Sequence, residues 1–593
     1  MLSTLLALLV LAAPARAATQ PFGGLVQFPG ALGCISEDGS GGRCADGRAL
    51  AGVSAVTAAG DRVYAVSPAG RLVVLEVNPR AGGFVEGGCF SATALAGCAT
   101  LPALAGASDV AAADDRVYVT ARGSDAVLRF RRSGSGLAYG GCVAAALAGC
   151  VAAPALNAPA AVAAGPRSGD VWVASSDSLE VFSWDLSSAG RCFREGGGGG
   201  CSPARALSQP RDVAIAGTQT LVASSGSNGV AVFRRGAQAG GTAGCITAGG
   251  SDGCAAGTGL LGAARIAAFR ENAYVGAPGS GALTTLRVPS ATAAPSRVAS
   301  GSAPTGALAI PPETFVADAP SYAGSHVYAG GGGIAPFARD AVSGRLAAMA
   351  GPAFSPSGAV RDLAVSGDVD SAAVYAAVPS AGAVLAFDRE IPPSCGPFFA
   401  PEPVPPLASG DKLVPLPCYD ANGDELRFSL ETPPARGRVA GFTSTAALYE
   451  PPATGPAGTD RFTVRVSDGA ESALAGLQVR FPGHAVPRPK LRILDRRARM
   501  DRRGRIVVRL RCTPAAGRRC RATLAAGRAR RGATLRAGRA TKVRLALPRR
   551  LRRAVRRHAK RGVLVRLTAT ARDGAGRRAR TTRKVRVRPR RSP

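Results

Sequence analysis

The strongest constraint on the fold is a motif that returns about every fifty residues through roughly the first two thirds of the chain. Short strand-like runs with a bulky centre occur seven times, 47 to 54 residues apart, and each lies among other short apolar segments. Four strands per repeat at this period are typical of a β-propeller, in which neighbouring sheets bury each other's faces. The centres of the seven runs are Tyr64, Tyr118, Trp172, Val222, Tyr274, Tyr328 and Tyr375.

The two ends of the repeat region predict how such a ring closes. After Arg389 the chain leaves the pattern without a fourth strand, whereas residues 24–34 have the fourth-strand pattern with no three strands before them. We therefore expect residues 25–28 to complete the seventh sheet, so that no sheet edge stays open. A solenoid, the other architecture built from repeats, does not account for one missing and one surplus strand.

The N-terminus and the cysteines predict export. Residues 1–17 contain a short apolar run and end in a small-x-small sequence, which is typical of a cleaved signal peptide. The chain has 14 cysteines in consecutive close pairs and only three histidines, so structural disulfides are favoured over zinc sites. The repeats of Tyr328 and Tyr375 are expected to lack a pair. The expected disulfides are Cys34–Cys44, Cys89–Cys98, Cys142–Cys150, Cys192–Cys201, Cys245–Cys254, Cys395–Cys418 and Cys512–Cys520.

The repeated Val-Tyr-Val/Ala strand, the Ala-Val-x-x-Phe-x-Arg strand and the Gly-x-Leu strand before Gly-Cys resemble the seven-bladed propellers of the lactonase-like and surface-layer-repeat superfamily. The resemblance covers about residues 22–391, points to exported proteins of high-GC bacteria, and implies a fold rather than an activity. Enzymes of this superfamily place polar residues around the axial funnel. His326, which directly precedes a strand, is interpreted as a satisfied polar residue at a strand end. It is also the one catalytic candidate, as a general base, but no acid or nucleophile can be paired with it.

A proline-rich stretch opens a second segment, residues 392–485. Its Asp-rich turn, Tyr-x-Pro stretch and Asp-x-Phe-x-Val strand ending in Ser-Asp-Gly resemble bacterial Ig-like, cadherin-like domains. The resemblance implies a β-sandwich in which Cys395 and Cys418 tie the first two strands. Alternating side-chain oxygens in the turn are typical of calcium ligands, but a plain Asn-Gly-Asp turn is the favoured interpretation and calcium the alternative, and no other cofactor is expected. The candidate calcium ligands are Asp420, Asn422, Asp424 and Asp468.

The third segment, residues 486–593, carries the excess of positive charge. Residues 488–593 hold 40 Lys and Arg against three Asp, while the preceding 487 residues have a net charge of −3. Alternating apolar and basic residues predict a small β-sandwich, with a short basic helix at residues 548–560. The segment resembles the compact basic domains that end many exported surface proteins of high-GC bacteria.

A charge of this size predicts polyanionic partners, namely anionic envelope polymers or lipid headgroups. Nucleic acid is disfavoured, because the chain is expected to be exported and residues 488–593 contain no Phe, Tyr or Trp for base stacking. A solvated basic surface without a partner is the alternative. The candidate anion-binding residues are Arg549, Arg550, Arg552, Arg553, Arg556 and Arg557.

The sequence therefore predicts an all-β protein: a signal peptide, a seven-bladed propeller over residues 18–391, and two small β-sandwich domains. We expect a secreted or cell-surface bacterial protein without catalytic activity that binds or scaffolds, with the propeller as recognition module for a ligand the sequence does not indicate. A lactonase-like hydrolase acting in the propeller funnel is the alternative. Three or more polar or charged residues converging in the funnel would favour the enzyme, and a lining of small residues would favour the scaffold.

Overall fold

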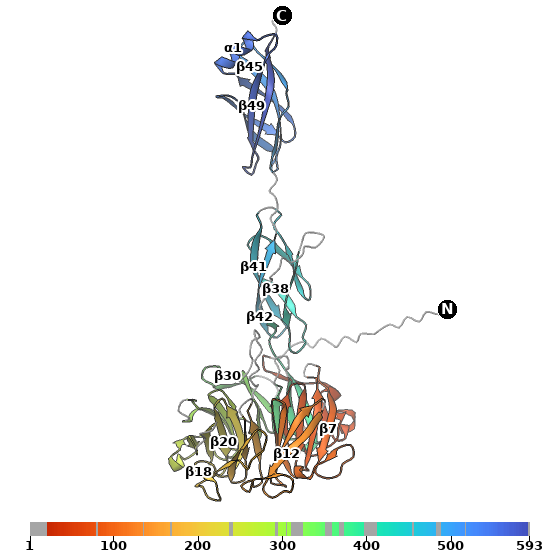
Figure 1. The fold of residues 1–593 in the computed structure, drawn as a ribbon, viewed down its shortest axis with the longest axis vertical. Helices are drawn as coiled ribbons and strands as arrows, with labels where there is room; N and C mark the ends of the chain where they lie inside the picture. Colours follow the sequence, from red (N-terminus) through yellow and green to blue (C-terminus); the bar gives the residue numbers. More distant parts are fainter. Residues whose placement is uncertain are drawn as a thin grey trace, which may run out of the picture. The chain divides into compact units, whose positions relative to one another are not determined.

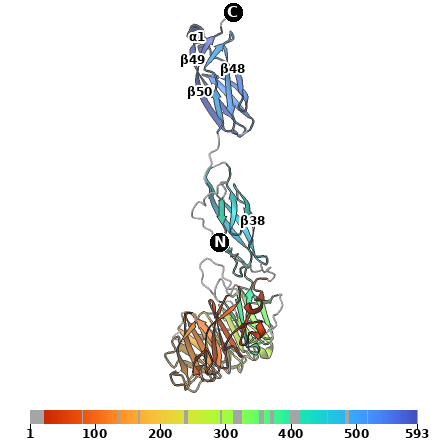
Figure 2. The same cartoon turned by 90° about the vertical axis from the view of Figure 1, so that its right-hand side faces the viewer.

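The computed structural model describes most of the chain from residue 21 on (Figures 1 and 2). The expected signal peptide lies outside the described residues. Within those residues the chain is all-β, as predicted, with a single α-helix, and no helix is long and apolar enough to span a membrane. The described ranges are 21–78, 81–134, 136–165, 169–235, 241–290, 294–303, 305–309, 324–349, 358–366, 373–396, 412–453, 456–481, 488–515 and 517–590.

The chain divides into two compact units. The first extends to Glu450 and includes Asp460–Val479; the second comprises Pro451–Thr459 and the chain from Arg480 onward. Each is described by itself.

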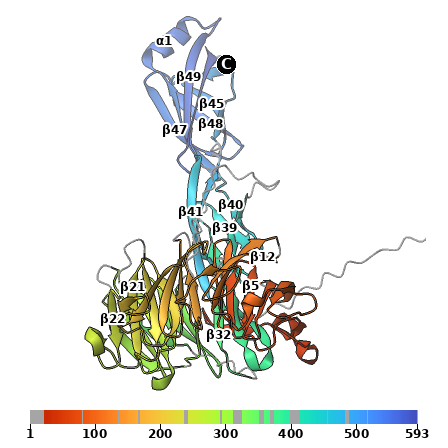
Figure 3. The same cartoon turned by 60° about the horizontal axis from the view of Figure 1, so that its bottom comes forward.

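The described part of the first unit begins with seven mainly antiparallel sheets that follow one another along the chain (Figure 3). The first sheet contains β4 (Ala55–Ala59), β5 (Arg62–Ser67), β6 (Arg71–Val77), β7 (Phe84–Ser91) and β8 (Ala99–Thr100). The second contains β9 (Ala107–Ala113), β10 (Arg116–Ala121), β11 (Ala126–Ser133), β12 (Gly136–Ala144) and β13 (Val151–Ala152). The third contains β14 (Ala161–Ala164), β15 (Asp170–Ala174), β16 (Ser178–Ser183), β17 (Arg191–Glu195) and β18 (Ser202–Ala204). The fourth and fifth contain β19 (Pro210–Ala216), β20 (Gln219–Ser224), β21 (Gly229–Arg234), β22 (Gly244–Thr247) and β23 (Ala255–Ala256); and β24 (Arg265–Phe269), β25 (Asn272–Ala277), β26 (Ala282–Arg287) and β27 (Ser296–Ser302). The sixth contains β28 (Ala307–Ala309), β29 (His326–Gly330), β30 (Ile334–Arg339) and β31 (Leu346–Ala348), and the seventh contains β32 (Asp362–Val365), β33 (Ala373–Val378) and β34 (Ala383–Arg389).

The first strands of these sheets contact one another in a closed cycle. β4 contacts β9, and the contacts continue through β14, β19, β24, β28 and β32 back to β4. Buried side chains at the centres of the second strands fill the space between sheets. Tyr64 lies in one core with Val110 of the next sheet, and Trp172 lies in one core with Val213 of the next. The bulky residues that mark the sequence repeat thus pack sheet against sheet.

The N-terminal segment completes the seventh sheet in two pieces. β1 (Leu25–Gln27) pairs with the end of β34, with Leu25 opposite Arg389. β2 (Cys34–Ser36) pairs with the beginning of β34, with Cys34 opposite Leu385. The segment expected to form one closing strand, residues 25–28, therefore lies at the seventh sheet. A second short strand, β2, continues along the same edge of β34.

All seven expected disulfides are present. Five of them close a loop that follows the outermost antiparallel strand of a sheet. After this loop the chain pairs in parallel with that same strand for two or three residues, as β8 does with β7. The expected distribution was wrong in one respect: the sheet of Tyr375 does carry a disulfide, Cys34–Cys44, because β2 joins it. Among the described residues, the sheets of Tyr274 and Tyr328 contain none.

The first unit continues with three small sheets. Tyr449 of β40 stacks on Phe462 of β41 with ring centroids 6.1 Å apart, so two of these sheets pack face to face. The sheets are β35 (Ser394–Cys395) with β37 (Cys418–Tyr419); β36 (Lys412–Pro415), β40 (Ala446–Glu450) and β39 (Arg438–Phe442); and β38 (Arg427–Thr432), β41 (Gly458–Ser467) and β42 (Ser472–Phe481).

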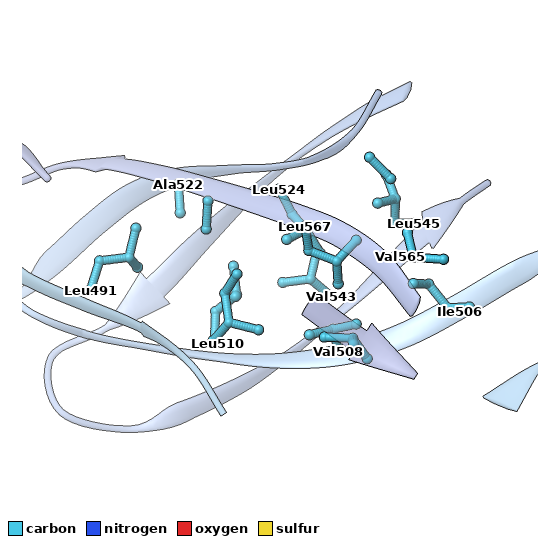
Figure 4. Close-up of a cluster of buried hydrophobic side chains, with 14 of the residues drawn as sticks. Leu491, Ile506, Val508, Leu510, Ala522, Leu524, Val543, Leu545, Val565 and Leu567 are labelled. Carbon is cyan, nitrogen blue, oxygen red and sulfur yellow. The ribbon is translucent and has the colours of Figure 1, made fainter. Parts of the chain in front are cut away.

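The second unit is one eight-stranded sheet system around an apolar core. Apolar residues alternate with exposed arginines along its strands, and Figure 4 shows the apolar side chains gathered in the interior. Val555 of the helix α1 (Arg549–Arg557) is also buried there. The strands are β43 (Lys490–Ile493), β44 (Arg497–Met500), β45 (Arg505–Thr513), β46 (Arg519–Ala526), β47 (Ala529–Arg536), β48 (Ala540–Ala546), β49 (Val563–Arg572) and β50 (Arg578–Pro589).

Candidate functional site

A central cavity of about 800 Å³ lies where the first strands of the seven sheets begin. The turns between the second and third strands of several sheets also reach it, since those turns lie at the same end. All seven sheets line the cavity, in sheet order through Ser54, Ser108, Ala160, Arg211, Arg265, Gly306 and Arg361 among others.

Four arginines supply the charge of this cavity, and the other described lining residues are Gly, Ala, Pro, Ser and Thr. Arg122, Arg211 and Arg361 are exposed, whereas Arg265 is half-buried. Arg265 Nε donates to the Gly306 carbonyl oxygen at 2.8 Å and its Nη2 to the Arg361 carbonyl oxygen at 3.3 Å. Among the described residues none of the four forms an ion pair, so the cavity presents positive charge that no acid neutralises by contact.

Three aspartates lie one residue further along the first strands: Asp109 in β9, Asp212 in β19 and Asp362 in β32. Each carboxylate accepts a backbone N–H from the first strand of another sheet. These bonds are Val162 N to Asp109 Oδ2 at 2.8 Å, Ile266 N to Asp212 Oδ2 at 2.9 Å and Val56 N to Asp362 Oδ2 at 2.8 Å. Burial, together with the charge of Asp362, raises the pKa of Asp109 to about 8. Burial likewise raises the pKa of Asp212 and that of Asp362, the latter to about 6.

The four arginines of the central cavity can bind an anion. The four converging arginines satisfy the charge criterion set above for an enzyme, but they all carry the same sign. A guanidinium group stays protonated and therefore cannot act as a general base. Among the described residues, the lining contains no His, Cys, Asp or Glu that could activate one of its hydroxyl groups.

His326 lies at the opposite end of its sheet. Gly330, at the other end of β29, pairs with Ala307, which directly follows the cavity residue Gly306. The His326 side chain is buried, its Nδ1 is 2.8 Å from Ser325 Oγ, and Phe22 packs edge-on against its ring at 4.5 Å.

Burial and the charge of Arg389 lower the pKa of His326 to about 3, so its imidazole is neutral at physiological pH. This environment favours the interpretation of a satisfied polar residue at a strand end.

A cluster of carboxylates lies just after β34. Glu390, Asp420 and Asp468 are each more than nine-tenths buried, and each has one carboxylate oxygen without a hydrogen-bond partner. The second Asp420 oxygen accepts the backbone N–H groups of Asn422 and Asp424 at 2.9 and 3.1 Å, which caps the turn. Burial and the nearby carboxylates raise the pKa of Glu390 to about 9, and burial raises that of Asp420 to about 6.

Two of the four candidate calcium ligands, Asp420 and Asp468, thus belong to this cluster, and the charge of Asp424 acts on Glu390 and Asp420. Asn422 is engaged elsewhere. The Asn422 amide donates to Asp388 Oδ1 and to the Arg389 carbonyl oxygen, both at 2.7 Å, and its Oδ1 accepts the N–H of Ile391 at 3.0 Å. No three His, Cys, Asp or Glu side chains within the described ranges are arranged to hold a metal ion. Glu390 is the member of the cluster that sequence reasoning missed; the signal was an acidic residue at the end of the last repeat.

The second unit keeps nearly all of its positive charge. Its three aspartates are paired, Asp495 with Arg509 at 2.8 Å, Asp501 with Arg505 at 3.0 Å and Asp573 with Arg577 at 3.3 Å. Five of the six candidate arginines of α1 are exposed, whereas Arg552 is half-buried.

A basic surface that sequence reasoning missed lies on the strands of the second unit. Arg521 of β46 pairs opposite Arg572 of β49, and Arg572 pairs opposite Arg578 of β50. We call these three exposed side chains the arginine row. With Arg488 and Arg580, the row lines a hollow of about 1240 Å³. The alternation of arginine along each strand was visible in the sequence, but the pairing of the strands was not.

Comparisons with known proteins give no functional assignment. The chain matches no protein family and no curated protein. Among solved structures, it resembles an endo-fucoidan hydrolase of glycoside hydrolase family 107, with a TM-score of 0.16, 14% identity and coverage of 39% of each chain. A variant of that enzyme matches with a TM-score of 0.15, 15% identity and coverage of 40% of this chain and 39% of the other. At such TM-scores the likeness carries no argument about fold or function.

Proposed function

We propose that the protein is an exported, non-enzymatic binding protein of the bacterial cell envelope. In this proposal the seven sheets form a seven-bladed β-propeller that recognises a ligand, the following sheets form an Ig-like spacer, and the second unit attaches to anionic envelope polymers or lipid headgroups. Seven disulfides fit an oxidising extracellular environment. The closed cycle of first strands and the N-terminal strands of the seventh sheet support the propeller.

The observation that carries the attachment is the arginine row. Like charges directly opposite one another on a sheet destabilise it. The three aspartates of this unit pair with Arg505, Arg509 and Arg577, which are not members of the row. Phosphate groups of a wall polymer or of lipid headgroups would supply the missing negative charge, because the planar guanidinium fork binds phosphate in a bidentate manner.

The attachment is tested with the full chain and two matched variants. One variant replaces the arginine row by glutamine (Arg521→Gln, Arg572→Gln, Arg578→Gln); the other makes the same charge change on α1 (Arg549→Gln, Arg553→Gln, Arg557→Gln). Binding to phosphate-bearing cell walls and to anionic or zwitterionic vesicles is measured at low and high salt. We expect salt-sensitive binding that the row variant weakens at least tenfold and the helix variant less than threefold.

The results separate the interpretations. Stronger binding to walls than to anionic vesicles would identify the polymer as the source of phosphate, and the reverse would identify the lipid. Equal weakening by both variants would overturn the row as the binding site and assign the effect to net charge. Absence of binding at low salt would overturn the attachment itself.

The lactonase-like alternative makes a different demand. It requires a base beside the central cavity, whereas His326 lies at the other end of its sheet and the described lining contains only arginine as a titratable residue. We therefore do not expect the purified protein to hydrolyse lactones, and His326→Gln should not change any trace activity.

A further inference from the structure

The central cavity gathers positive charge from widely separated parts of the chain. Its four arginines come from four different sheets: Arg122 from the second, Arg211 from the fourth, Arg265 from the fifth and Arg361 from the seventh. Because an arginine stays charged at any physiological pH, the repulsion among these groups cannot be relieved by loss of a proton. A negative ligand can relieve it.

Arg265 and Arg361 form the best-defined part of this charge. The two contacts of Arg265 to the carbonyl oxygens of Gly306 and Arg361 use its Nε and one Nη2 donor. Among the described residues, the Nη1 donors make no hydrogen bond, and Arg361 donates none from its guanidinium group. Burial and the charge of Arg265 lower the pKa of Arg361, whereas the charge of Asp362 acts to raise it. Arg265 thus holds an oriented guanidinium group with free donors at the backbone of Arg361, whose own side chain is exposed.

The remaining described lining leaves room for a ligand and supplies polar atoms. It consists of small residues and prolines, so no large side chain fills the cavity. The Ser54 hydroxyl has no hydrogen-bond partner. The cavity volume lies within the roughly 300–1,000 Å³ of small-molecule pockets.

The three aspartates offset only part of this charge, since Arg265 acts to lower the pKa of Asp212 and of Asp362. Their carboxylates are directed to backbone N–H groups of neighbouring sheets, and none forms an ion pair with a lining arginine among the described residues. Burial also favours their protonated form, most strongly for Asp109. The arginines are therefore left available to a ligand entering from solvent.

From this geometry we propose that the central cavity binds a small organic anion that carries at least two phosphate or carboxylate groups. One group takes the free donors of Arg265 and Arg361, and the other reaches Arg122 or Arg211 across the ring. Charge-assisted, bidentate hydrogen bonds from guanidinium groups to such oxygens are among the strongest polar contacts in proteins. This proposal rests on the proposed function, because it names the class of ligand that the propeller would recognise.

The test uses the full chain in the background of the arginine-row variant, so that anion binding by the second unit is reduced. Titration calorimetry is carried out with three probes: fructose 1,6-bisphosphate, citrate and neutral fructose. We expect the two anions to bind with a dissociation constant below about 100 μM at low salt and fructose not to bind; −5.5 kcal/mol corresponds to about this affinity. The tighter of the two anions identifies phosphate or carboxylate as the preferred group.

Two variants decide whether the cavity is the site. Arg265→Gln with Arg361→Gln should weaken binding of the anions at least tenfold. The control Arg345→Gln removes one exposed arginine from the turn between β30 and β31, at the other end of the sixth sheet, and should leave the affinity unchanged. A circular dichroism spectrum and a Tm close to those of the parent protein show that the double variant is folded.

Unchanged affinity in the folded double variant would overturn the inference. Binding of sulfate as tight as that of the bisphosphate would also overturn it, because it would indicate an unspecific anion site. Neither result would affect the attachment of the second unit, which is measured separately on walls and vesicles. Loss of wall binding together with retained anion binding in the cavity would overturn the attachment alone.

Discussion

At the scale of single residues, Glu180 shows how a buried polar group makes stability depend on pH. Its side chain is 1% exposed in β16, and its carboxylate accepts hydrogen bonds from Ser175 Oγ at 2.6 Å and Ser178 Oγ at 2.5 Å. Burial raises the pKa of Glu180 from 4.5 to about 7. The protonated acid is therefore the form that the fold prefers, and its contribution to stability is fully present below pH 4.5 and lost as the pH rises through 7.

The substitution Glu180→Gln keeps the shape and removes the titration. Between pH 5 and pH 8 we expect the variant to gain about 2–3 kcal/mol of unfolding free energy relative to the parent protein. Urea unfolding of the first unit at pH 5, 6, 7 and 8 measures this difference, with the exposed Glu425→Gln as control. Parallel pH profiles of parent and variant would show that Glu180 does not titrate in this range.

At the scale of elements, the end of β34 and the turn at residues 420–424 meet at the buried carboxyl groups of Glu390 and Asp420, and we call this contact the joint. Glu390 keeps its proton because its pKa is raised to about 9, first by burial and then by Asp468 and the other nearby carboxylates. The stability of this joint is thus fully present below pH 4.5 and lost as the pH rises through 9. In the Glu180→Gln background, we expect Glu390→Gln to reduce the remaining fall of Tm between pH 6 and pH 9, while Asp109, with its pKa raised to about 8, keeps its own share of that fall.

The same joint tests the calcium expectation. No three described carboxylates are arranged to hold a metal ion, so calcium binding would require Glu390, Asp420 and Asp468 to move together. Bound calcium would take the place of the proton and raise Tm more at pH 8.5 than at pH 5.5. The Asp468→Asn variant would lose that rise. An unchanged Tm with calcium at both pH values would mean that the proton alone neutralises the cluster.

The sequence predicted those elements whose partners are close along the chain. The cysteines of each disulfide are 8 to 23 residues apart, so their pairing could be inferred, and the bulky centres of the second strands repeat at a visible period. The assignment of Cys34–Cys44 to the sheet of Tyr375 could not be inferred from local spacing, because β2 and β34 pair across nearly the whole first unit.

The candidate sites could not be located from the sequence for the same reason, because they depend on which strands lie next to one another. The cavity arginines are single residues in separate repeats, at positions 122, 211, 265 and 361, and the sheets bring them together. The arginine row depends on the register of β46, β49 and β50. A helix is local, so the arginines of α1 were visible from the sequence, whereas those facing across a sheet were not.

At the scale of the whole molecule, the two compact units differ in charge, and this predicts that salt acts on them differently. Residues 1–487 have a net charge of −3 and residues 488–593 one of +37. Self-repulsion among uncompensated like charges destabilises a compact state, and salt screens it, since the Debye length falls from about 30 Å at 0.01 M to about 8 Å at 0.15 M. Scanning calorimetry of the full chain should therefore show two transitions.

Raising the salt concentration from 0.01 to 0.3 M should raise the Tm of the second unit by several degrees and that of the first by much less. Polyphosphate at low ionic strength should reproduce the shift of the second unit, because a bound polyanion neutralises the same arginines. The row variant Arg521→Gln, Arg572→Gln, Arg578→Gln should respond less to polyphosphate than the matched helix variant. One shared transition, or two transitions that move equally with salt, would contradict the assignment of the charge effect to the second unit alone.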